Sequence, residues 1–185
     1  MGTIVEEVPA PSPTATVKVV LYQALSQGAK WDWLVEKACE VGVSRIVPVL
    51  TVRTLVKVSE AHVHEKLIRW QRIALAATKQ CGRADTMQVD TPMSFVKAIA
   101  NRGPDSLSLI PWEKESEWSV QQACQGFTGT QINLFIGPEG GWDPQEVTWA
   151  EEAGIVPVRL GPTLLRTETA GLIASTLVLR ELGIY

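Results

Sequence analysis

Short apolar runs alternate with a helix-type pattern along the chain, and this alternation constrains the fold most strongly. Residues 17–22 and 45–49 are apolar runs rich in β-branched side chains, as in buried strands. Between them, apolar residues recur at helical spacing up to Gly42, a residue type typical of a helix C-terminus. Because parallel strands need a crossover connection, this order predicts a parallel strand–helix–strand unit.

The rest of the chain continues the alternation. Further strands are predicted at residues 107–110, 132–136 and 156–160, and helices from Ser59 to Gln80, after Pro92, at residues 118–124, after Asp143 and at residues 170–179. Residues 170–179 contain no charged side chain, so we expect this last helix to be buried on all sides, within the fold or against a second subunit.

Composition sets the class of protein. With 185 residues, of which 45% are hydrophobic and 20% charged, the chain is expected to form one globular domain. It contains no apolar run of about 18–20 residues and no signal-peptide pattern, which predicts a cytoplasmic protein without membrane spans. A net charge of -3 means that nucleic acid would have to bind a local patch.

Few residues favour metal or redox chemistry. Cys39, Cys81 and Cys124 are far apart in the sequence and are interpreted as reduced structural thiols. His62 and His64 lack further metal ligands in the pattern and would point to nearly opposite sides of a helix, so no metal site is predicted.

One flank of the helix predicted to end near Gln80 is basic. Its charged residues are Lys66, Arg69, Arg72 and Lys79. Such a flank is more often a solvated helix face than a phosphate-binding surface, and both interpretations stay open.

Two loops rich in Gly and Pro carry the functional signal. Residues 137–141 (GPEGG) and 161–169 (GPTLLRTET) each follow a predicted strand directly. Ligands of open α/β sheets bind at the carboxyl ends of strands, and glycine lets the backbone approach them closely. Each loop alone could be an ordinary tight turn, but the recurrence predicts a site that holds a flat heterocycle through backbone groups.

Several common sites lack their motifs here. The sequence contains no G-x-x-x-x-G-K-[ST], no G-x-G-x-x-G after a strand and no G-x-S-x-G. A P-loop, a Rossmann dinucleotide site and an α/β-hydrolase site are therefore not expected.

Four blocks together resemble one enzyme family. The blocks are WDWLVEKA at residues 31–38 with GV at 42–43, RWQRIA at 69–74 with QCGR at 80–83, GPEGG at 137–141, and LGP at 160–162 with LLRTETA at 164–170. They resemble, in order, the bacterial methyltransferases that modify N3 of a uridine in small-subunit (16S) ribosomal RNA. The resemblance extends from about residue 17 to the end of the chain.

The resemblance implies a SPOUT methyltransferase fold: a mostly parallel sheet with helices on both faces and a C-terminal trefoil knot. It also implies S-adenosylmethionine as cofactor, a ribosomal RNA substrate and a homodimer. The cofactor-binding residues it implies are Ile136, Gly137, Pro138, Glu139, Gly140, Gly141, Leu160, Gly161, Leu164, Leu165, Arg166, Thr167 and Thr169.

The same resemblance places Arg166 and Glu168 at the reacting groups. Glu168 is a candidate acceptor for the N3 proton, and Arg166 a candidate to stabilise negative charge on the uracil oxygens. The alternative is that the two side chains pair with each other or cap the last helix.

The chain departs from the family pattern in two places. The family usually carries an N-terminal RNA-binding domain resembling the PUA fold, whereas residues 1–16 read as a proline-rich arm or the remnant of such a domain. Thr163 replaces a basic or larger polar residue. A non-catalytic cofactor-binding or dimerisation module is therefore the alternative function, and an anion nest at residues 137–141 is the weakest one.

Overall fold

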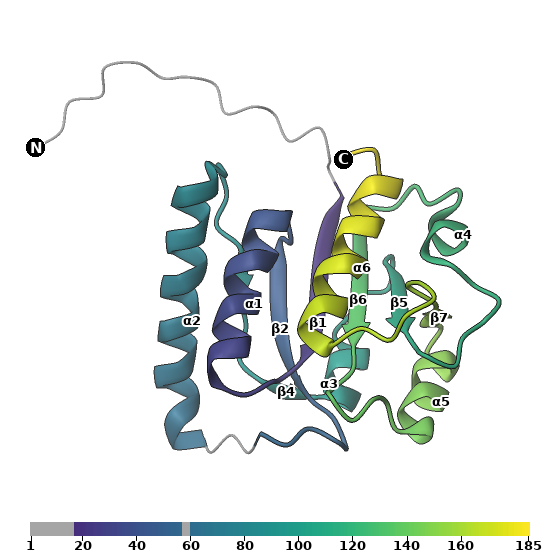
Figure 1. Ribbon diagram of the computed structural model, residues 1–185, viewed down its shortest axis with the longest axis horizontal. Helices are drawn as coiled ribbons and strands as arrows, with labels where there is room; N and C mark the ends of the chain where they lie inside the picture. The colour runs from purple at the N-terminus through teal and green to yellow at the C-terminus, as the bar shows by residue number, and fades with distance from the viewer. Residues whose placement is uncertain (1–16, 57–59) are drawn as a thin grey trace, which may run out of the picture.

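The computed structural model describes residues 17–56 and 60–185 and contains a seven-stranded, entirely parallel sheet (Figure 1). Its strands are β1 (Lys18–Ala24), β2 (Arg45–Leu50), β3 (Gln88–Val89), β4 (Met93–Ser94), β5 (Leu107–Pro111), β6 (Gln131–Ile136) and β7 (Val156–Val158). They are ordered β3-β2-β1-β6-β5-β7, with β4 also paired to β2. The sequence did not predict β3 and β4, because two residues are too few to form a pattern.

Helices cover both faces of the sheet. They are α1 (Gly28–Val41), α2 (Glu60–Cys81), α3 (Phe95–Ala100), α4 (Val120–Cys124), α5 (Pro144–Glu152) and α6 (Thr167–Glu181). Buried residues of α1, α2, α4 and α6 join the core on one face, and those of α3 and α5 join the core on the other. The predicted sheet with helices on both faces is confirmed, whereas the trefoil knot stays a prediction.

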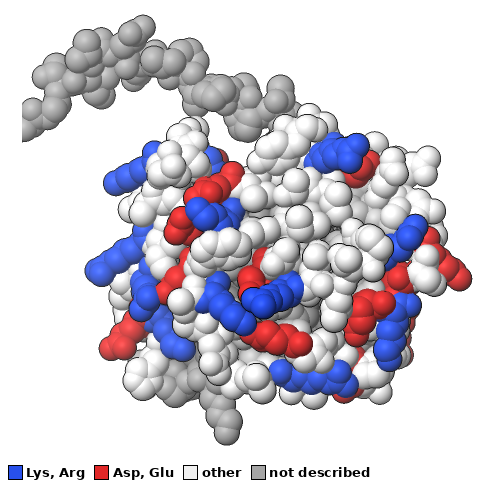
Figure 2. All heavy atoms as spheres, viewed as in Figure 1, with Lys and Arg blue, Asp and Glu red and all other residues white. Residues whose placement is uncertain are grey.

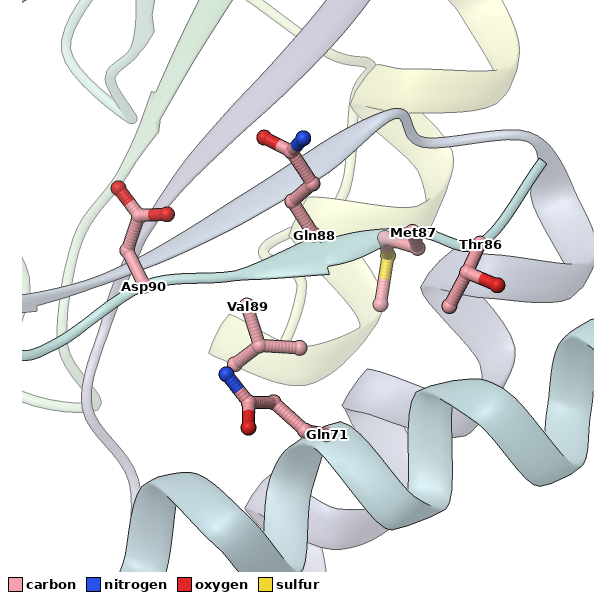
Figure 3. Close-up of a pocket in the computed structure, with 6 residues that line it drawn as sticks. All are labelled: Gln71, Thr86, Met87, Gln88, Val89 and Asp90. Atoms are coloured by element: carbon pink, nitrogen blue, oxygen red, sulfur yellow. The ribbon is translucent and has the colours of Figure 1, made fainter. Parts of the chain in front are cut away.

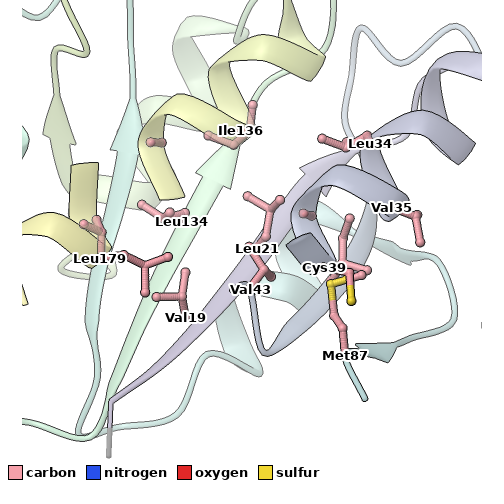
Figure 4. Packing of buried hydrophobic residues seen from close by; sticks show 14 of the residues in the cluster. Val19, Leu21, Leu34, Val35, Cys39, Val43, Met87, Leu134, Ile136 and Leu179 are labelled. Atoms are coloured by element: carbon pink, nitrogen blue, oxygen red, sulfur yellow. The ribbon is translucent and has the colours of Figure 1, made fainter. Parts of the chain in front are cut away.

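Alternate side chains of strand β1 pack into the two hydrophobic cores on opposite faces of the sheet. Val19 and Leu21 face the core beneath α1 and α6, where Leu34 and Leu179 meet them (Figure 4). The alternate residues face the opposite core, where Tyr22 stacks on a ring of β6. A central strand of a parallel sheet is buried on both sides, which explains its continuous apolar run.

Local signals placed most helix ends correctly. Gly42 ends α1 with a φ of 106°, and Asp143 with Glu146 forms the capping box that begins α5. Ser59, the predicted N-cap of α2, and the proline-rich residues 1–16 lie outside the described residues.

Helix α6 corrects the predicted start of the last helix. It begins at Thr167, three residues before the predicted start, so Glu168 and Thr169 belong to its first turn. In the single chain, Ile173 is 40% exposed and Thr176 is exposed, so the fold alone does not bury the helix on all sides. Burial of this face against a second subunit stays a prediction. An uncharged face can meet solvent as well as a core, and the pattern of charges does not distinguish the two.

The described residues show no group of three or more His, Cys, Asp or Glu side chains arranged for a metal ion. Within the same residues, no helix combines the length and apolarity needed to cross a membrane. Cys39 and Cys124 are packed in the core, and burial raises the pKa of the Cys124 thiol to about 11.

Candidate functional site: a cleft between two glycine-rich loops

A cleft of about 1230 Å³ lies at the carboxyl edge of the sheet. The loops that follow β5, β6 and β7 form its walls, and the first turn of α6 closes one end. Because all strands are parallel, these loops meet at one edge although they are far apart in sequence.

The structure brings together almost all the predicted site residues. From the first loop and second loop, the cleft is lined by Ile136, Gly137, Pro138, Glu139, Gly140, Gly141, Leu160, Gly161, Leu164, Leu165, Arg166, Thr167 and Glu168. Thr169 lies in α6 and is not among the lining residues. The contacts that these residues make with a cofactor stay predictions.

The hydroxyl of Thr167 joins the two loops. Its Oγ1 accepts a hydrogen bond of 2.9 Å from Nε2 of Gln23, at the end of β1, and donates one to the carbonyl oxygen of Gly137. Thr167 and Gln23 are both buried. The ends of β1 and β6 and the start of α6 are therefore held by one side chain.

The first loop folds as a tight turn. The N–H of Gly141 donates to the carbonyl oxygen of Pro138 at 2.9 Å, and Gly141 has a φ of 69°, a conformation that favours glycine. At Gly137, a Cβ would lie 3.1 Å from the indole of Trp142. Trp142 is itself fixed by a 3.1 Å hydrogen bond from Nε1 to the carbonyl oxygen of Pro111.

Glu168 is a lining residue of this cleft. The residue is only 9% exposed, and its buried Oε2 has no hydrogen-bond partner among the described residues. Arg166 is exposed, and no ion pair joins it to Glu168 in the described part of the chain. The alternative in which the two side chains hold each other is therefore wrong for this conformation. Glu168 lies in the first turn of α6, where the helix dipole stabilises a negatively charged carboxylate.

Sequence reasoning missed the third wall of the cleft. Trp112, Glu113 and Glu115 line it from the loop after β5, and Arg159 lines it from the end of β7. For the residues after β5, the available signal was their position after a predicted strand. Arg159 was missed because the strand was predicted to continue to residue 160, whereas β7 ends at Val158. Glu115 also holds its own loop, because the backbone N–H groups of Trp118 and Glu117 donate to its Oε1 at 2.9 and 2.6 Å and lower the pKa of its carboxyl group.

Lys30, in the first turn of α1, is a further missed residue. It lines the cleft, and its Nζ lies 3.8 Å from Oε1 of Glu139 in the first loop. Both side chains are substantially exposed, so this pair adds charge near the mouth of the cleft rather than much stability.

The predicted basic flank of α2 lies away from the cleft. Lys and Arg side chains gather along the α2 side of the face seen in Figure 2, whereas the area over α6 carries few charges. Arg69 forms an ion pair with Asp32 of α1. This pairing supports the solvated-face interpretation for Arg69, and phosphate binding by the flank stays untested.

A smaller hollow of about 390 Å³ lies between α2 and β3 (Figure 3). Gln71 borders it from α2, and residues 86–90 border it from the segment containing β3. Its charged member, Asp90, is already paired with Arg45. The chemistry-bearing residues therefore concentrate in the larger cleft.

Comparison with known proteins identifies the family. Residues 13–179 match the model of the RNA methyltransferase domain family. The chain belongs to this family. The matched region contains both glycine-rich loops and almost all of α6.

Relatives of this RNA methyltransferase domain include a protein from Synechocystis named ribosomal RNA small subunit methyltransferase E. It is 34% identical over 176 residues, which cover 94% of this chain and 55% of the relative. The chain thus spans little more than half the length of that protein.

Two solved structures are similar to the whole domain. Ribosomal RNA small subunit methyltransferase E from Neisseria gonorrhoeae, bound to S-adenosylmethionine, has 31% identity and a TM-score of 0.78, covering 89% of this chain and 66% of its own. A Legionella pneumophila protein in complex with the same cofactor has 30% identity and a TM-score of 0.80, with the same two coverages.

Proposed function

We propose that the domain is an S-adenosylmethionine-dependent methyltransferase acting on N3 of a uridine in small-subunit ribosomal RNA. The observation that carries the proposal is the cleft whose two glycine-rich walls are joined by Thr167. Two similar structures contain S-adenosylmethionine, which supports this cofactor. The names of the relatives support the ribosomal RNA substrate.

The residues of the cleft fit such a cofactor. A Cβ on Gly161 would meet nothing within 4 Å, so the backbone of the second loop is accessible to a ligand. The exposed Leu164 and the half-buried Leu165 offer apolar contacts beside it. When bound, S-adenosylmethionine supplies an electrophilic methyl group on a sulfonium.

The chain's own task is to align the acceptor and remove its proton. Transfer to N3 of uracil breaks the N3–H bond, and that proton needs an acceptor. We assign this role to Glu168, a lining residue of the cleft whose buried Oε2 has no hydrogen-bond partner among the described residues. Arg166, exposed at the same cleft, is assigned the stabilisation of negative charge on the uracil oxygens.

The first experiment is calorimetric titration of the full chain with S-adenosylmethionine. We expect saturable binding by wild type and by Thr148→Val, an exposed control on α5, and strong weakening by Gly161→Val, whose side chain would enter the loop's open space. Absence of binding by folded wild-type protein would reject the proposal. Binding without methyl transfer to small-subunit ribosomal RNA would favour the non-catalytic module.

Glu168→Gln tests the proton acceptor. Because the amide cannot accept the proton as a carboxylate does, we expect kcat to fall on the order of a hundredfold, a typical general-base contribution. The affinity for S-adenosylmethionine is expected to change little, and Glu168→Asp to recover part of the rate. A loss in kcat well below tenfold, with cofactor affinity intact, would remove Glu168 from this role.

We also propose that the domain forms a homodimer through the exposed, uncharged face of α6. Support comes from Ile173, exposed by 40% in the isolated chain, and from the absence of charge between Thr169 and Leu179. The cytoplasmic location stays a prediction from the sequence.

A further inference from the structure

The loop between β2 and α2 contacts the first glycine-rich loop from outside the cleft. Within it, Thr51 and Thr54 form a compact turn: the N–H of Thr51 donates to Oγ1 of Thr54 at 2.9 Å, and the two hydroxyls lie 2.8 Å apart. None of these residues lines the cleft. The turn presents the intervening Arg53 toward residues 140–143.

Arg53 contacts that segment at two points. Its Nη1 donates to the carbonyl oxygen of Gly140 at 3.1 Å, and its Nη2 lies 3.3 Å from Oδ2 of Asp143. The other carboxylate oxygen of Asp143 accepts the N–H of Gln145 and caps α5. The planar guanidinium is suited to such a double contact, because its donors have a fixed relative orientation.

The contact with Gly140 fixes one peptide group of the cleft wall. In a trans peptide the C=O and N–H point in opposite directions. Here the carbonyl of Gly140 points to Arg53, and the N–H of Gly141, the other half of the same peptide, donates to Pro138 at 2.9 Å. Since both ends of the group are held, the backbone that a cofactor would meet at Gly140 and Gly141 has a defined orientation.

Glu146 also links the loop after β2 to the segment before α5, and this link does not involve Arg53. Glu146, only 1% exposed, accepts the N–H of Val52 at 2.9 Å through Oε1 and the N–H of Asp143 at 3.2 Å through Oε2. The side chain of Arg53 is 43% exposed, and an exposed ion pair of this kind contributes little to folding stability. Loss of Arg53 should therefore free the peptide without detaching the loop.

We propose that Arg53 is a positioning residue of the cofactor site, acting through the carbonyl of Gly140 and the carboxylate of Asp143. It orients the 140–141 peptide for binding and makes no contact with the cofactor itself. This inference rests on the proposed function, because it assumes that S-adenosylmethionine occupies the cleft.

The test compares Arg53→Met with Arg45→Met in the full chain. Arg45 is a matched control: its side chain is 44% exposed and paired with Asp90, but it lies at the opposite end of β2. Calorimetric titration with S-adenosylmethionine should give a dissociation constant about tenfold higher for Arg53→Met, the size of one charge-assisted hydrogen bond. Arg45→Met should stay within about twofold of wild type.

Two further measurements separate positioning from folding. The urea midpoint without cofactor should be nearly the same for both variants, and Arg53→Lys should recover part of the affinity because its ammonium can reach one of the two acceptors. Wild-type binding with an unchanged dissociation constant for Arg53→Met would overturn the inference alone. A large fall of the urea midpoint in Arg53→Met would also overturn it. Failure of wild type to bind would reject the proposed function and the inference together.

Discussion

The hydroxyl of Thr167 joins two groups from different parts of the sheet, the amide of the buried Gln23 in β1 and the carbonyl of Gly137 directly after β6. The family resemblance pointed to Thr167, but nothing in the sequence pointed to Gln23, since a single glutamine in an apolar strand belongs to no pattern. Asp143 shows the opposite case, because its capping partners lie within three residues. Short-range partners are readable from sequence, whereas partners 144 residues apart need the fold.

Thr167→Val removes the hydroxyl and keeps the shape. The buried amide of Gln23 and the carbonyl of Gly137 then each lose a partner, so we expect the free energy of unfolding to fall by about 1–3 kcal/mol. Affinity for S-adenosylmethionine should fall as well, since the two loops are no longer joined. Urea denaturation and calorimetry measure the two effects, with Thr167→Ser expected to stay close to wild type. If Thr167→Val and Thr167→Ser gave the same free energy of unfolding and the same cofactor affinity, the hydroxyl would have no such role.

At the scale of elements, α6 lies so close to β1 that a Cβ at Gly171 would force a neighbouring side chain to move. A Cβ on Gly171 would collide with Oε1 of Gln23 and lie 3.6 Å from Cδ2 of Leu21. The existence of β1, β2 and β6 was predicted well because each is a continuous apolar run, and that of α1 because its apolar residues recur at helical spacing. The start of α6 was placed too late, since the Arg-Thr-Glu-Thr segment looks like the continuation of a loop until its packing is known.

Gly171→Ala tests this close packing. In an exposed helix the change would stabilise by up to about 1 kcal/mol, but overpacking in a core costs about 1–3 kcal/mol. We therefore expect a net loss of about 1 kcal/mol and weaker cofactor binding, because Gln23 must move away from Thr167. Thr148→Ala, on the exposed face of α5, is the control and should show no loss. An increase in unfolding free energy for Gly171→Ala would contradict the close approach.

For the whole molecule, strand order decides which loops meet. The sequence predicted parallel strands but could not order them, so the loop after β5 was missed as a wall of the cleft although its strand was predicted. Order depends on long-range pairing, such as that between β1 and β6, which leaves no local pattern. The two sides of the sheet also differ at the surface, because α6 presents a face without charge.

Ile173→Asp tests the proposed dimer. Placing a carboxylate in an apolar interface leaves a buried unpaired charge, so we expect sedimentation velocity to show a dimer for wild type and a monomer for the variant. Trp149→Asp is the matched control: Trp149 is 39% exposed, against 40% for Ile173, but lies on α5 across the sheet. Wild-type protein that stays monomeric, or a dimer that persists in Ile173→Asp, would contradict the proposed interface.

Because all strands run in the same direction, their amino ends lie at one edge of the sheet and their carboxyl ends at the opposite edge. Lys18 is exposed at the amino end of β1, while the cleft lies at the carboxyl edge. The 7 residues of β1 place these ends roughly 23 Å apart at about 3.3 Å per residue. A fluorophore or surface linkage attached at the amino edge would therefore leave the glycine-rich loops unobstructed, which makes that edge the place to immobilise the domain.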